Sequence, residues 1–181
     1  MRAEPVAEPL VGFRHWGCKR GGLYSGIFVA GRFVPNPALG MIAPRVGLMP
    51  WPTDRERVAK CFALRGHEAP YRDCRCGWSA YYSLAAEPEL PAPECVWGAV
   101  VAWGTIVECE TGFRAQFVRP LALLDRENPD DLREQGRRAA YAAEAYGIPL
   151  LARDELIAYA HWHGEVRIRE SSPKTWCKRS S

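Results

Sequence analysis

The chain has 181 residues, of which 48% are hydrophobic and 25% are charged, and Lys plus Arg exceed Asp plus Glu by 24 to 21. This composition is typical of a folded soluble protein with one domain. The net charge of +3 permits nucleic-acid binding without requiring it. No apolar run reaches the roughly 18 residues of a membrane span, so we expect no contact with a membrane.

The N-terminal stretch MRAEPVAEPL contains prolines and acids where a signal peptide needs a continuous apolar segment. We therefore expect a cytoplasmic protein, with residues 1–9 disordered, a single domain over residues 10–168 and a basic tail over residues 169–181. In a reducing compartment, clustered cysteines bind metal or catalyse more often than they form disulfides. The seven cysteines of the chain are therefore informative.

The first half of the expected domain combines strands and loops. Residues 11–17 and 23–34 are rich in aromatic and β-branched residues, and the CKRGG segment between them predicts a turn. Residues 35–53 contain five prolines and two glycines, which predicts a loop. Residues 53–60 predict a short helix that leads into the first clustered cysteine. The segment EPELPAPE predicts a second connector.

The clearest structural signal is a pair of long β-rich runs on either side of an ETG turn, in which Gly112 is expected to take a positive φ. Both faces of the first run are apolar, which predicts a strand buried on both sides, as in a small closed barrel or a sandwich. Pro120 predicts an edge or a bulge in the second run. Two helices are expected after it, one ended by Gly147 and one running from Asp154, its expected N-cap, to Gly164.

The most specific motif is the stretch CFALRGHEAPYRDCRC at residues 61–76. Four residues in it supply the soft donors that a tetrahedral structural zinc site needs, namely Cys61, His67, Cys74 and Cys76. The last two are separated by one residue, which is tighter than usual, and Gly77 would ease the turn between them. The alternative interpretation is three buried thiols and an ordinary histidine.

A catalytic zinc ion is the other alternative, because Glu68 adjoins His67. Zinc nucleobase deaminases carry H-x-E followed by P-C-x-x-C, and both spacings differ here. Three thiolates and one imidazole also fill a tetrahedron, which leaves no position for water. The fold class we expect is therefore α+β: a small β-barrel-like or strongly bent antiparallel sheet with a structural zinc loop and C-terminal helices.

Two segments carry a resemblance: HEAPYRDCRCGWSAYY with its preceding cysteine, and WGAVVAWGTIVECETGFRAQFVRPLAL. Over roughly residues 11–150 the chain resembles a group of uncharacterised actinobacterial proteins with an H-x-A-P…C-x-C-G pattern, which implies a shared fold and site. The glycine- and valine-rich hairpin is also similar to PUA-like barrels, which include readers of modified bases.

Aromatic and basic side chains beside the loops suggest a ligand surface. The candidates are Trp16, Trp51, Trp78, Tyr81, Arg72 and Arg75, and further arginines, among them Arg14 and Arg114, are interleaved with them. The simpler interpretation is core tryptophans and a solvated charged surface. We hypothesise a non-enzymatic module that binds nucleic acid, with a modified or flipped base in an aromatic-lined pocket. The alternatives are a protein–protein adaptor with a structural zinc site and an enzyme with unidentified acid/base residues.

Overall fold

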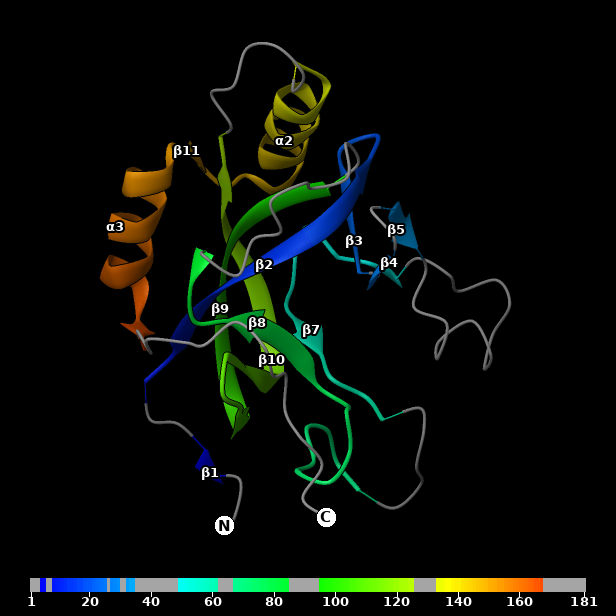
Figure 1. Ribbon diagram of the computed structural model, residues 1–181, viewed down its shortest axis with the longest axis vertical. Helices are drawn as coiled ribbons and strands as arrows, with labels where there is room; N and C mark the ends of the chain where they lie inside the picture. The colour runs from blue at the N-terminus through cyan, green and yellow to red at the C-terminus, as the bar shows by residue number, and fades with distance from the viewer. Residues whose placement is uncertain are drawn as a thin grey trace.

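The computed structural model describes residues 4–5, 8–25, 27–29, 32–34, 49–61, 67–84, 95–125 and 133–167. Expectations for the loop over 35–48, the connector over 87–94, the tail over 169–181 and most of residues 1–9 lie outside these ranges. The described part is a mainly antiparallel, strand-rich sheet with two helices, which agrees with the expected mixed class (Figure 1). Neither described helix is long and apolar enough to cross a membrane.

Four antiparallel strands form a closed ring of pairings at the centre of the molecule (Figure 1). The ring contains β2 (Leu10–Lys19), β9 (Cys95–Glu108), β10 (Gly112–Leu124) and β8 (Trp78–Tyr81), each paired with the next. The ring closes because β8 returns to β2 through a single residue pair, Phe13 with Tyr81. The β8–β2 corner therefore has much less backbone pairing than the other three.

Short strands extend this ring. They are β1 (Glu4–Pro5) on β9, β3 (Gly22–Ser25) on β2, β6 (Met49–Pro50) on β3, β7 (Arg57–Val58) and β11 (Leu150–Leu151) on β10, and β12 (Glu165–Val166) on β2. A separate hairpin pairs β4 (Ile27–Val29) with β5 (Arg32–Val34). The predicted turn after the first strand is confirmed, with Arg20 and Gly21 at φ of 51° and 76°.

The long strand β9 is buried on both faces, as its sequence predicts. On one face Val96, Val100, Ala102 and Ile106 join a core cluster that α2 (Arg133–Tyr146) covers; we call this the inner core. On the other face Trp97 and Ala99 join a second cluster with Leu156 and Ala160 of α3 (Arg153–His163). The helices thus protect opposite faces of the same strand, α2 at the top of the molecule and α3 at its side (Figure 1).

Several local expectations for the second half of the chain are confirmed. A register shift in the β9–β10 pairing follows Pro120, which is the predicted bulge. Gly147 follows the end of α2 with a φ of 61°, and Gly164 follows the end of α3. The N-cap of α3 is Ala152 rather than the expected Asp154, because Glu155 reaches back to accept a hydrogen bond from the Ala152 backbone N–H.

The helix expected over residues 53–60 is wrong. Residues 53–55 form a bend, and Arg57 and Val58 form β7, paired with Val118 and Phe117 of β10. The acidic and basic residues of this segment suit a short helix, but an isolated helix of eight residues is marginal in water. Pairing with the edge of β10 satisfies the backbone instead, so tertiary context overrides the local preference.

The strands β7 and β8 together form one interrupted strand along the edge of β10. The Ala59 N–H donates to the Gln116 carbonyl oxygen at 2.7 Å, and the next position on β10, Ala115, pairs with Trp78. The chain therefore leaves the edge after Ala59 and returns at Trp78 one position further on. Residues 60–77 are an excursion from this strand, and we call them the excursion loop. We call the two ends of this loop, where the chain leaves β10 and returns to it, the neck. The first and last of the clustered cysteines lie there.

Gly112 does not adopt the positive φ expected for it. This glycine is required for a different reason, because a Cβ atom there would collide with the carbonyl oxygen of Ala80 and lie 3.0 Å from the Cα of Tyr81. The two strands β8 and β10 approach closely at this point, and only a residue without a side chain leaves room for the backbone of β8.

We expect Gly112→Ala to lower the free energy of unfolding by about 1–3 kcal/mol, because the extra methyl group forces the β8 backbone away from β10. Chemical denaturation measures this change. The matched control is Gly136→Ala in α2, where a Cβ would meet nothing within 4 Å. That variant should be neutral or more stable by up to about 1 kcal/mol. Equal stabilities of the two variants would contradict the close approach.

Candidate metal centre

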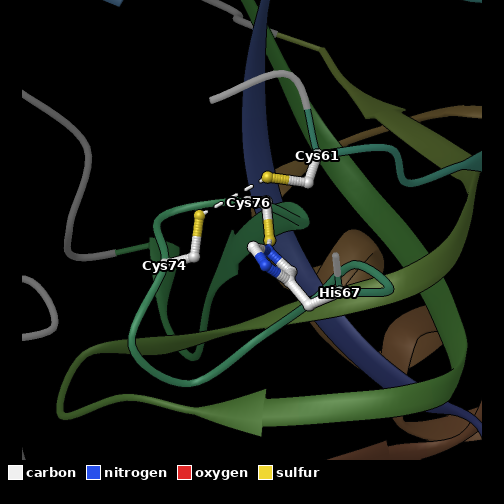
Figure 2. Close-up of side chains that lie close together, drawn as sticks. All are labelled: Cys61, His67, Cys74 and Cys76. Carbon is white, nitrogen blue, oxygen red and sulfur yellow. Dashed lines mark hydrogen bonds between the residues drawn. The ribbon is translucent and has the colours of Figure 1, made fainter. Parts of the chain in front are cut away.

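The four residues that the sequence predicts as metal ligands lie together (Figure 2). Each of Cys61, His67, Cys74 and Cys76 offers one ligand atom, and these atoms all lie within 4.8 Å of one another. The Sγ atoms of Cys61 and Cys74 are 3.6 Å apart, and the Nε2 atom of His67 is 3.3 Å from the Sγ atom of Cys76. The four side chains converge from different parts of the excursion loop, so this cluster could hold a metal ion.

These separations fit a tetrahedral ion. With metal–sulfur bonds of about 2.3 Å, two sulfur ligands of a tetrahedron lie about 3.8 Å apart. The Cys61–Cys74 separation of 3.6 Å is close to that edge, and it is far longer than the roughly 2.05 Å of a disulfide bond. None of the three cysteines forms a disulfide bond. The cluster is also partly shielded, with Cys74 buried and the other three ligands at intermediate exposure.

The site spans the neck of the excursion loop. Cys61 lies two residues after Ala59, the last residue hydrogen-bonded to β10, and Cys76 lies two residues before Trp78, where pairing resumes. Gly77 makes the turn back into β8 with a φ of 109°, which a residue with a side chain rarely adopts. A Cβ atom at Gly77 would lie 2.8 Å from the Cβ of Pro70. Gly77 thus supports the turn as predicted.

Arg114 of β10 organises the backbone of this loop from beneath. Its terminal nitrogens donate hydrogen bonds to the carbonyl oxygens of Tyr71 (3.2 Å), Arg72 (3.3 Å), Cys74 and Cys76 (3.1 Å). The side chain is 5% exposed, so its burial lowers the pKa of the guanidinium, which the nearby Cys76 and Cys74 partly oppose. A buried cation that gathers several carbonyls in this way fixes the loop before any ligand binds.

The Cys76 thiol is held toward its neutral form in the metal-free cluster. Burial is the main cause that raises the pKa of Cys76 to about 11; the neighbouring Cys74 and Cys61 contribute to this rise, and a hydrogen bond from the Tyr71 backbone opposes it. A divalent cation reverses this effect because it favours the thiolate form. Beside them, the ring of Tyr71 stacks on His67 with centroids 4.7 Å apart while 46% of Tyr71 stays exposed. This contact orients the imidazole toward the sulfur atoms.

The structure separates the remaining predicted ligand residues into two groups. Trp16 lies inside β2 rather than beside a loop and is 0% exposed, and Trp51 is 4% exposed, so both are core side chains in this conformation. Trp78 and Tyr81 lie in β8 and are partly exposed. Arg72 and Arg75 are exposed on the excursion loop, between the metal ligands.

Sequence reasoning did not single out Arg114, which counted as one of several arginines on a charged surface. The signal that could have identified it is its position in GFRAQF, inside a strand whose neighbours are apolar. A charged residue there must be buried, and a buried charge needs partners. The carbonyl groups of the excursion loop are those partners.

Comparisons of the chain with protein-family models, with curated proteins and with solved structures find no significant match. The geometry of the site therefore carries the functional argument alone.

We expect purified protein to contain about one transition-metal ion per chain, and Cys76→Ser to lose it, because three ligands hold the ion far less tightly than four. Elemental analysis of the purified proteins measures the content. Cys18→Ser is the control, since Cys18 is a free, buried thiol outside the cluster. Metal-free wild-type protein with undiminished stability would contradict a resident metal.

We expect Arg114→Met to weaken metal binding by about 10- to 100-fold, because the carbonyls of the loop lose the donor that orders them. A competition titration with a chromophoric chelator measures the affinity. Arg119→Met is the matched control, because Arg119 is exposed on the same strand. Unchanged affinity in the Arg114 variant would mean that the ligands alone determine the loop conformation.

Proposed function

We propose that the Cys/His cluster holds a structural zinc ion. Three thiolates and one imidazole form a soft, four-membered donor set, and their separations support a tetrahedral geometry. Four protein ligands leave no coordination position for water or substrate, which argues against a catalytic ion. Once bound, zinc would link the two ends of the excursion loop through its bonds to the cysteine and histidine side chains.

We propose further that this zinc-braced loop is part of a nucleic-acid-binding surface. The observation that carries the proposal is the set of side chains that the loop exposes: Arg72, Arg75 and, at 46% exposure, Tyr71. Arginine suits phosphate oxygens, and an exposed tyrosine ring suits stacking on an unpaired base. Their backbone is fixed by Arg114, so these contacts would need little ordering on binding.

Recognition of a modified or flipped base is a finer form of the same proposal. Trp78, which keeps partial exposure in β8 two residues after Cys76, is the aromatic side chain available for it, whereas Tyr81, five residues after Cys76, packs on the opposite face of β8. The similarity of the 95–124 hairpin sequence to PUA-like barrels is the basis for this finer form. In this form, the zinc loop would hold the backbone while Trp78 contacts the base.

A protein–protein adaptor is the second candidate, and one observation favours it. Trp162 on α3 is 86% exposed and Tyr141 on α2 is 61% exposed. Large aromatic side chains are enriched where proteins dock. These two residues lie on the helices rather than on the excursion loop, so the two candidates can be separated by substitution.

We expect zinc-loaded protein to bind short single-stranded DNA or RNA with an affinity that falls as salt rises, because phosphate contacts release counterions. In Arg72→Gln/Arg75→Gln, the slope of the logarithm of the binding constant against the logarithm of the salt concentration should become shallower by about 1.4. Each lost phosphate contact to a single strand contributes about 0.7 to this slope. Fluorescence anisotropy at several salt concentrations measures both quantities.

The control is Arg119→Gln/Arg137→Gln, which removes the same charge from two other exposed positions. If both double variants weaken binding equally, the effect is only net charge and the loop surface is not the contact. If the wild-type protein binds no nucleic acid at low salt, the adaptor becomes the better proposal, and Trp162→Ala is the variant to examine next.

A further inference from the structure

A second cluster of functional side chains lies inside the ring of strands, and it contains two arginines and two tryptophans. The guanidinium carbon of Arg14 is 5.2 Å from the ring centroid of Trp51 and 5.8 Å from that of Trp78. The guanidinium carbon of Arg57 is 5.1 Å from the same Trp78 ring. The two indole rings are themselves in contact, with centroids 5.3 Å apart. We call Arg14, Trp51, Arg57 and Trp78 the Arg/Trp cluster.

The strand register explains why these residues meet. Arg57 pairs with Val118 and Trp78 pairs with Ala115, and both partners belong to the inner core. Side chains of directly paired residues lie on the same face of a sheet, so Arg57 and Trp78 also face the inner core. Arg14 lies two residues before Trp16 on β2, so its side chain is on the same face of the sheet as this inner-core residue. The ring therefore brings two cations to one face of a largely apolar interior.

Hydrogen-bond donors exceed acceptors in this region. Arg14 donates to the Ser79 carbonyl oxygen and to the Ser25 hydroxyl, which also accepts from the Trp51 indole N–H at 2.6 Å. Four further donor atoms are buried without an acceptor: Arg14 Nε, Arg57 Nε, Trp16 Nε1 and Trp78 Nε1. Buried polar groups normally have hydrogen-bond partners, so an excess of buried donors indicates that an acceptor is missing.

The two positive charges also have no counter-charge in the part of the chain that the structure describes. Within the described ranges of the chain, no carboxylate forms an ion pair with Arg14 or Arg57; the ion pairs found there join Arg167 to Glu108 and to Glu165. Burial lowers the pKa of Arg14 to about 10, and the nearby Arg57 adds to this effect. Burial also lowers the pKa of Arg57. Uncompensated cations in an apolar setting are costly unless an anion joins them.

We propose that the Arg/Trp cluster is a binding site for a phosphate group. Two guanidinium groups match the two negative charges of a phosphate dianion, and the unpaired Arg and indole N–H groups match its several acceptor oxygens. Arg14, Arg57 and Trp78 each have intermediate exposure as whole residues, although the unpaired nitrogen atoms are buried. The site goes beyond the proposed nucleic-acid surface, because it uses none of the exposed residues of the excursion loop.

Arg57 is the residue that tests the proposal. Arg14 ties β2 to Ser79 of β8 and to Ser25 of β3, so its substitution can unfold the ring. Within the described residues the Arg57 side chain makes no hydrogen bond, and its guanidinium group lies over the face of Trp78. Arg57→Gln therefore removes one cation while the backbone pairing of β7 is kept.

The experiment is a titration of full-length, metal-loaded protein with inorganic phosphate in a phosphate-free buffer, followed by tryptophan fluorescence and by calorimetry. We expect saturable binding that Arg57→Gln weakens at least about tenfold, since a hydrogen bond to a charged group contributes about 1.5–3 kcal/mol. Arg119→Gln is the matched control, because Arg119 is exposed on β10 outside both proposed sites, and it should bind phosphate like the wild-type protein. Circular dichroism confirms that each variant is folded.

Two further ligands identify the source of the phosphate group. A 5′-phosphorylated oligonucleotide that binds more tightly than its 5′-hydroxyl counterpart, in an Arg57-dependent manner, would indicate a nucleic-acid end. Equal binding of the two oligonucleotides, together with saturable binding of inorganic phosphate, would indicate a small phosphate compound. Absence of phosphate binding at millimolar concentration, or wild-type affinity in folded Arg57→Gln, would overturn the proposal. Neither result depends on Arg72 or Arg75, so the nucleic-acid proposal is tested separately.

Discussion

The excursion loop depends on one buried guanidinium group. Arg114 extends from β10 and donates to carbonyl oxygens of Tyr71, Arg72, Cys74 and Cys76, so residues 71–76, which form no helix or strand, have a defined path. The same loop backbone would otherwise leave carbonyls unsatisfied against the sheet. The charge of Arg114 also suits the cluster above it, because a divalent ion with three thiolates carries a net charge of −1.

The second constraint is the interruption of the edge strand. Because β7 and β8 occupy successive positions on β10, the two ends of the excursion loop are brought together by strand pairing before any metal binds. A metal at the neck then links Cys61, four residues after Arg57, to Cys76, two residues before Trp78. The metal cluster and the Arg/Trp cluster are therefore mechanically connected, although they lie on different parts of the same interrupted strand.

Local sequence patterns predicted the elements whose structure depends mainly on their own residues or on a strong hydrophobic periodicity. The 95–124 hairpin, the two helices and the Cys/His cluster were all predictable, because an apolar run, helix-ending glycines and soft donors at close spacing each indicate one structure. The predictions were wrong where contacts with residues distant in the sequence determine the local conformation. Residues 57–58 became a strand because β10 offered an edge, and Gly112 is required by the approach of Ala80 rather than by its own φ.

By itself, then, the sequence determined the mixed class, the double burial of β9 and the identity of the four metal-binding candidates, since these depend on composition, alternation and spacing within short segments. Only the tertiary structure decided which arginines are exposed and which are buried. Arg72 and Arg75 are on the loop surface, whereas Arg114 and Arg14 lie against carbonyls and indole rings. The physical reason is that the burial of a charge depends on the donors, acceptors and rings that distant strands bring to it, and no local pattern in the chain encodes that set of neighbours.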